Sequence, residues 1–212
     1  MISKIRFTLT EHLKNNKNTY LFLFLAFVTG VSAGAFTVNG LSPIQRSELT
    51  NYFQGFLELF ENQKVDSNEI LKISLIDNLR LVALLWALGV TIIGIPLIYI
   101  FIGVRGFITG FTSGFIIELM GVKGVIFTLF SIVPKEVIII PCVIALGVNG
   151  INFSLNIIRS RSAKRMSKEN LKTGFLAYCL ATALVSCFIF GGILVESYIT
   201  PICIRIITLK VF

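Results

Sequence analysis

The feature that most constrains this chain is a series of apolar runs, each about as long as a helix that crosses a lipid bilayer. A helix of about 20 residues, rising about 1.5 Å per residue, spans about 30 Å of hydrocarbon. These runs make 55% of the 212 residues apolar and leave 14% charged, whereas soluble domains carry about 25% charged residues. The chain is therefore predicted to be a single integral membrane domain over residues 1–212, an all-α polytopic helical bundle.

Five runs predict membrane-crossing helices, and a shorter one predicts a half-length or interfacial helix. The predicted crossings are Tyr20–Val38, Leu79–Ile102, Gly106–Gly121, Glu136–Ile158 and Thr173–Tyr198, and the short helix is Lys123–Val133. Pro96 is expected to bend the second crossing, because proline removes one backbone donor and clashes one turn back. For the first run, a cleaved export signal is the alternative, since Ala33-Gly34-Ala35 resembles a cleavage site.

Residues 40–78 form a segment of a different kind, with six of the eleven acidic residues and three basic ones. Within it, large apolar side chains at helical spacing form what we call the aromatic stripe: Leu49, Tyr52, Phe53, Phe56, Leu57 and Phe60. This spacing predicts an extracytoplasmic amphipathic helix. Two readings of the stripe stay open: it packs on the protein's own bundle or on lipid headgroups, or it docks a partner.

The basic residues predict the orientation of the chain in the membrane. Segment 1–19 holds four of them and segment 159–172 holds six, against three in the longer segment 40–78. Loops rich in Lys and Arg face the cytoplasm. Five crossings then put the N-terminal arm 1–19 and the basic loop 159–172 in the cytoplasm, and residues 40–78 outside. Because the net charge of +8 comes from segments beside the crossings, it predicts no nucleic-acid partner.

The side chains that intramembrane catalysis requires do not occur at bilayer depth in the predicted arrangement. His12, the only histidine, lies in the N-terminal arm, and the only aspartates, Asp66 and Asp77, lie in the predicted outer loop. No HExxH or Walker pattern occurs. The four cysteines have no ligand-like spacing, which argues against a metal site or a disulfide framework. The sequence therefore predicts a protein that is not an enzyme and has no cofactor.

Glycines recur every four residues in two of the apolar runs. Gly30 and Gly34 form one small-residue face, and Gly106, Gly110 and Gly114 form another. Such faces allow two helix backbones to approach closely. We expect them to pack helices within one chain, and self-association into a homo-oligomer is the alternative.

Glu118 is the one acidic residue embedded in an apolar run. An intramembrane charge is by default a candidate for transport or coupling, so a small transporter or channel-like subunit stays open as an alternative function. The other reading places Glu118 near the outer boundary, three residues before Gly121, where it reaches the surface or meets Lys123. The two halves of the chain show no convincing repeat of the kind found in transporters.

An ordered set of glycine, proline and aromatic positions extends from Asn78 to Ser154. Its members are Trp86, Gly89, Gly94-Ile-Pro96, Arg105-Gly106-Phe107, Gly110-Phe111, Gly114-Phe115, Met120-Gly121, Gly124, Pro134, Pro141 and Phe153-Ser154. This set closely resembles the stage II sporulation protein M family. Similar features at Val38-Asn39, after Asn156, and at Glu196-Ser-Tyr198 with Pro201 extend the resemblance over nearly the whole chain. Lys135-Glu136 departs from the family, where amides are expected.

The resemblance implies a non-catalytic component of the engulfment machinery in endospore-forming bacteria. It implies a multi-pass protein of the cell membrane, at the septal membrane of the mother cell. Its expected partners are membrane lipid and stage II sporulation proteins D and P, which degrade peptidoglycan outside the membrane. The implied role is a scaffold that recruits and positions these hydrolases for peptidoglycan remodelling.

Overall fold

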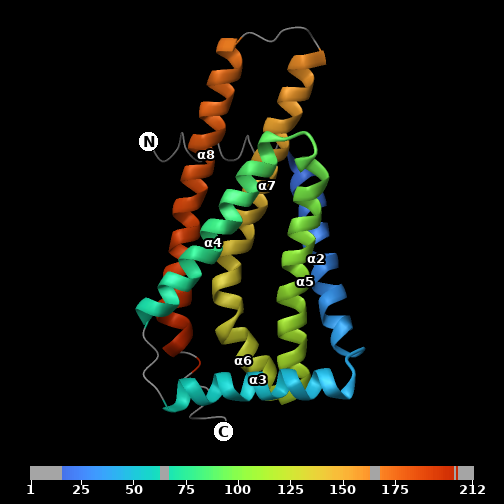
Figure 1. Ribbon diagram of the computed structural model, residues 1–212, viewed down its shortest axis with the longest axis vertical. Coiled ribbons are helices and arrows are strands. Elements are labelled where there is room, and N and C mark those ends of the chain that lie inside the picture. The colour runs from blue at the N-terminus through green and yellow to red at the C-terminus, as the bar shows by residue number, and fades with distance from the viewer. Residues whose placement is uncertain (1–15, 63–66, 163–167, 203, 205–212) are drawn as a thin grey trace.

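The structure is a computed structural model that describes residues 16–62, 67–162, 168–202 and 204. Helices account for nearly all of this part of the chain, and no strand occurs in it (Figure 1). The elements are α2 (Lys17–Val38), α3 (Pro43–Asn62), α4 (Ser67–Val90), α5 (Gly94–Met120), α6 (Val122–Ser131), α7 (Val133–Ser162), α8 (Lys168–Leu194) and the π-helix η1 (Val195–Ile199). The predicted all-α class is confirmed.

Five stretches of helix are long and apolar enough to cross a membrane, which confirms the predicted number of crossings. They are Lys17–Val38, Asn68–Val90, Gly94–Met120, Val133–Arg159 and Lys172–Ile202. The shorter apolar helix α6 spans 10 residues, against a predicted short helix over Lys123–Val133. Many large apolar side chains on the outside of the bundle are exposed, as expected where the surrounding solvent is lipid.

The predicted bounds of the second and third crossings are wrong. The second crossing ends at Val90 instead of Ile102, a tight turn occupies residues 91–93, and α5 then runs as one helix from Gly94 to Met120. Pro96 lies in the first turn of α5 and does not bend a crossing. Proline is tolerated there because the first backbone N–H groups of a helix have no intrahelical acceptor.

A glycine is required where the chain reverses into α5. A Cβ added at Gly94 would meet the carbonyl group of Leu88, which is at the end of the preceding helix. The Thr91 N–H also donates to Leu88 O, and the Gly94 N–H donates to Thr91 O. These contacts leave no room for a side chain at Gly94 and make the turn between α4 and α5 compact.

The predicted outer loop 40–78 is also shorter in the structure. Its first part forms α3, as predicted, but α4 begins at Ser67, so Glu69 and Asp77 belong to a membrane-crossing helix. The basic segment 159–172 is likewise partly helical, since α7 continues to Ser162 and α8 begins at Lys168. The arm 1–19 is described only from residue 16 onward.

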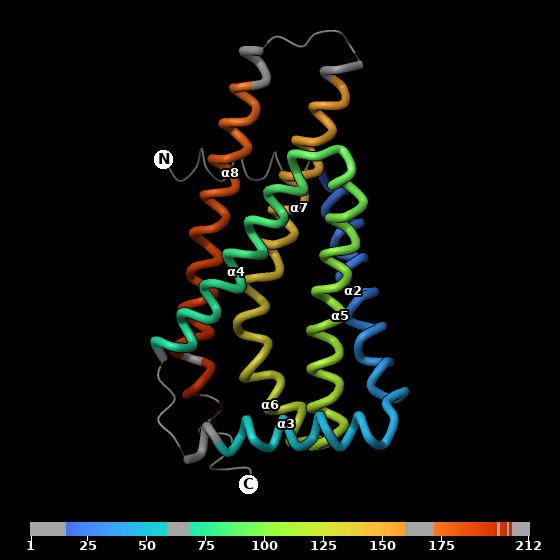
Figure 2. The backbone as a smooth tube through the Cα atoms, in the orientation of Figure 1, coloured from blue at the N-terminus to red at the C-terminus, as the bar shows by residue number. Residues whose placement is uncertain are grey.

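The helices form an upright bundle with α3 lying across one end of it (Figure 1). Figure 2 shows α2 and α5 side by side along most of their length, and α4 crossing in front of α7 and α8. The start of α2, the 91–93 turn and the facing ends of α7 and α8 lie at the end opposite α3. The described basic residues Lys17 at the start of α2, Arg159 on α7 and Lys172 on α8 are therefore at one end of the bundle.

One apolar core joins the five long helices. Its most buried members are Leu23 on α2, Leu85 on α4, Ile98 and Ile102 on α5, Ile139 on α7 and Ile189 on α8. A smaller cluster of Ile116, Phe127 and Ile204 lies under α3. The chain thus builds a single packed bundle, with α3 attached through a second, local cluster.

Candidate functional site

The aromatic stripe faces the protein's own bundle. Phe53, Phe56 and Leu57 pack against the cluster of Ile116, Phe127 and Ile204. The Phe53 and Phe127 rings meet edge to face, with centroids 5.8 Å apart. These three stripe residues hold α3 across the end of the bundle.

Tyr52 is the described member of the stripe that stays accessible, with 80% of its surface exposed. Leu49 is half-buried, and the side chain of Phe60 lies outside the described residues. An apolar groove of about 460 Å³ runs beneath the stripe, between α3, the ends of α5 and α6, the start of α7, and η1 with the residues that follow it. Its lining includes Leu49, Tyr52, Phe53, Phe56, Phe111, Phe115 and Pro201.

An ion pair fixes α3 to α5. The Arg46 guanidinium lies 2.5 Å from the Glu118 carboxylate, and both side chains are partly exposed. Glu118 therefore lies at the α3 end of the bundle with a cationic partner from another helix. This position agrees with the reading that places Glu118 near the membrane boundary, although its partner is Arg46.

The predicted glycine faces meet each other between α2 and α5. A Cβ added at Gly30 or Gly34 would collide with backbone atoms of α5, and one added at Gly106 or Gly110 would collide with backbone atoms of α2. At Gly114 the added Cβ would lie 3.1 Å from the Ala35 Cα atom. The two small-residue faces therefore pack together within one chain.

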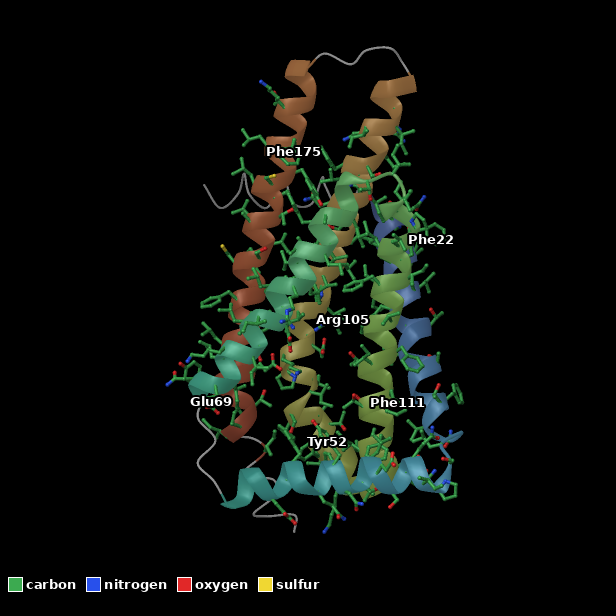
Figure 3. The ribbon with its side chains drawn as sticks, in the orientation of Figure 1. Phe22, Tyr52, Glu69, Arg105, Phe111 and Phe175 are labelled. Carbon is green, nitrogen blue, oxygen red and sulfur yellow. The ribbon has the colours of Figure 1, made fainter. Side chains whose placement is uncertain are left out.

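A cluster of charged and polar side chains lies inside the bundle and is not predicted by the sequence pattern. Arg105 on α5 faces Glu136 on α7, with 3.6 Å between Nη2 and Oε1. One residue earlier on α7, the Lys135 ammonium lies 2.5 Å from Glu196 on η1. Asn78 on α4 completes the cluster, and its Nδ2 donates to Ser74 O at 2.8 Å. Figure 3 shows Arg105 midway along the bundle, far from Tyr52.

Arg105, in this polar cluster, lies near the middle of a helix that is long and apolar enough to cross a membrane. Arg105 precedes Gly121 by 16 residues on the one helix α5, which puts it about 24 Å from the turn at a rise of about 1.5 Å per residue, and the ion pair places Glu136 beside it. A bilayer core is about 30 Å thick.

Glycine is required at the turn between α5 and α6, where the φ angle of Gly121 is 59°, because left-handed backbone strains other residues.

Buried polar atoms in the cluster have no hydrogen-bond partner within the described residues. They are Asn78 Oδ1, Arg105 Nε and Glu136 Oε2.

The sequence signal that indicates the cluster is the long apolar run on both sides of Arg105, which allows a membrane-crossing helix centred near this residue. A second crossing that ends at Ile102 places Arg105 at a membrane boundary instead.

The described residues contain no group of three or more His, Cys, Asp or Glu side chains placed to hold a metal ion. Three cysteines are described as free thiols: Cys142 and Cys179 are half-buried and Cys187 is exposed. The two features with functional potential are therefore α3, with its accessible Tyr52, and the intramembrane polar cluster.

Comparison with known proteins finds one matching family model. The model described as stage II sporulation protein M matches residues 23–201 of the chain. The matched region includes the α2–α5 glycine seam, α3 and every member of the polar cluster. Neither the curated proteins nor the solved structures yield a match.

Proposed function

This chain belongs to the stage II sporulation protein M family, and we propose that it is a non-catalytic scaffold that recruits septal peptidoglycan-degrading enzymes during engulfment. Family membership and the five apolar helices make it a sporulation-related, multi-pass membrane protein. The proposed role is to hold stage II sporulation proteins D and P at the septal membrane of the mother cell. In this role the protein supplies position, and the hydrolases supply the chemistry.

The observation that carries the proposal is the arrangement of α3. This helix lies across the end of the bundle and is held there by Phe53 and by the Arg46–Glu118 ion pair. Two apolar side chains of α3 stay open: Ile44 is 73% exposed, and Tyr52, at the edge of the groove beneath the helix, is 80% exposed. Accessible aromatic and aliphatic side chains on a rigid support are typical anchors of protein interfaces.

The charge distribution supports an extracytoplasmic position for α3. The helix lies at the end of the bundle opposite the start of α2 and the basic flanks of α7 and α8. Because basic flanks face the cytoplasm, the N-terminus is proposed to be cytoplasmic and α3 to face the compartment that holds peptidoglycan. A partner that works on the cell wall would meet the protein on this side.

The test replaces the two accessible anchors, Ile44 and Tyr52, by serine. The double variant should reach the membrane at normal levels, since neither side chain is buried. The two hydrolases should then disperse from the septum in sporulating cells and engulfment should stop, because interface anchors dominate binding energy. Fluorescent fusions of the hydrolases report the dispersal.

A matched control is Ile93→Ser, which removes an equally exposed side chain, 74% accessible, at the opposite end of the bundle. It should leave hydrolase localisation unchanged. Normal localisation and normal engulfment in the Ile44→Ser/Tyr52→Ser variant would refute docking through α3.

A second candidate function is a small transporter or channel-like subunit, and the polar cluster at bilayer depth favours it. Charged residues inside a membrane mark solute pathways in many transporters. The discriminating variant is Arg105→Gln/Glu136→Gln. Loss of sporulation with normal hydrolase recruitment would favour transport, whereas loss of recruitment by the α3 variant alone favours the scaffold.

A further inference from the structure

The polar cluster lines a cavity of about 290 Å³ between α4, α5, α7 and η1. Helices α4 and α5 join at the 91–93 turn and diverge toward α3, with α7 behind the gap (Figures 1 and 2). Among the lining residues, Val104 is 50% exposed and Ile108 is 60% exposed. Both lie well inside a membrane-crossing helix. The cavity therefore opens sideways, toward the bilayer.

The accessible charged groups that line this cavity are hydrogen-bond donors on Arg105 and Lys135 and acceptors on Glu136 and Glu196. Asn78 is 7% exposed and its Oδ1 accepts no hydrogen bond from the described residues. Glu136 Oε2 is a second unpaired acceptor, and Arg105 Nε–H is an unpaired donor. These three atoms are closed off from the cavity, so an occupant meets the accessible charged ends of the Arg105–Glu136 and Lys135–Glu196 pairs instead.

The charges around the cavity determine which occupant fits. Arg105 and Lys135 balance Glu136 and Glu196, and Asp77 at the mouth is offset by Arg80, 3.8 Å away. A ligand with a net charge would leave one charge unpaired at bilayer depth, which is costly. A zwitterion adds no net charge, and its two ends match the two signs of charge that line the cavity.

We propose that this cavity binds the headgroup of a zwitterionic aminophospholipid that enters from the bilayer between α4 and α5. The lipid phosphate accepts hydrogen bonds from Arg105 and Lys135, and the ammonium group donates to the carboxylates of Glu136 and Glu196. The acyl chains stay in the bilayer against Val104 and Ile108. This inference stands apart from the scaffold role, because it uses none of the α3 contacts.

The experiment measures lipid retention by the purified full chain with native mass spectrometry in detergent. Phosphatidylethanolamine and phosphatidylglycerol with identical acyl chains are compared, together with glycerophosphoethanolamine, which has the headgroup and no chains. Phosphatidylethanolamine should bind at least about tenfold more tightly than either of the others, as expected for charge-assisted hydrogen bonds made at both ends of the headgroup.

Two variants locate the binding. Arg105→Gln/Glu136→Gln removes both charges of one ion pair, so no lone charge is left buried, and it should weaken phosphatidylethanolamine binding about tenfold. Ile108→Trp enlarges an exposed side chain at the mouth and should block binding without disturbing the core. The matched control is Arg46→Gln/Glu118→Gln, which removes the other α5 ion pair and should bind like the original protein.

Three results would overturn the proposal. Equal binding of the two phospholipids would exclude recognition of the ammonium group. Tight binding of glycerophosphoethanolamine would identify a solute site instead of a lipid site. Unchanged phosphatidylethanolamine binding by Ile108→Trp would place the lipid elsewhere, and this outcome decides the question even if the Arg105→Gln/Glu136→Gln variant does not fold.

Discussion

Replacing Gly110 by alanine tests how closely α2 and α5 pack. The added Cβ would meet the backbone of Val31, with the carbonyl carbon and the Cα atom both 2.7 Å away. Ordinary carbon–carbon contact is about 3.5 Å, so one helix must move by about 1 Å. Overpacking of this kind costs about 1–3 kcal/mol, and the better helix propensity of alanine returns about 1 kcal/mol. We expect a net loss of up to about 2 kcal/mol in the free energy of unfolding.

Gly103→Ala is the matched control, because it lies on the same helix two turns away. Its Cβ would lie 3.6 Å from Ala26 O, an ordinary contact, so alanine there should stabilise the protein by up to about 1 kcal/mol. Both variants are unfolded reversibly in one detergent by SDS titration, followed by circular dichroism. If Gly110→Ala unfolds at the same SDS fraction as Gly103→Ala, the α2–α5 seam does not exist as described.

Two further predictions test the membrane arrangement. In a background without the natural cysteines, Gln54→Cys on α3 should react with an impermeant thiol reagent added to intact cells and Arg159→Cys should not, because the basic flanks face the cytoplasm; labelling at 159 would reverse the orientation. Pro96→Ala should change the free energy of unfolding by less than about 1 kcal/mol, because proline in the first turn costs α5 no hydrogen bond, whereas a gain of about 3 kcal/mol would indicate a proline that interrupts a crossing.

The number of crossings could be predicted from the sequence because bilayer thickness sets the length of each apolar run. The bounds of two crossings could not, because the turn at Thr91, Ile92 and Ile93 contains no charged residue or polar cluster to mark it. Gly94 and Pro96 fit a kink inside a helix as well as a turn between helices. Only the packing of the α4 end against the α5 start distinguishes the two.

The amphipathic character of α3 could be predicted from spacing alone, but the occupant of its apolar side could not. Phe53 and Phe56 at helical spacing can pack equally well against the protein's own bundle or against a partner protein. In the structure these two side chains cover the bundle, and Tyr52, which neighbours Phe53 on the same stripe, stays exposed. The shape of the bundle beneath α3 thus decides which stripe residues pack against it and which stay accessible.

The polar cluster depends on the register of a long-range hairpin, which local sequence patterns do not contain. Arg105 lies 16 residues before the turn at Gly121 on α5, and the ion pair places Glu136 on α7 beside it. A crossing that ended at Ile102 would put Arg105 at the membrane surface, where a lone arginine needs no partner. Once α5 starts at Gly94, the same arginine lies at bilayer depth and requires an anionic partner, and α7 supplies it through Glu136. The position at which α5 begins therefore decides whether Arg105 marks a membrane boundary or forms a buried ion pair with Glu136.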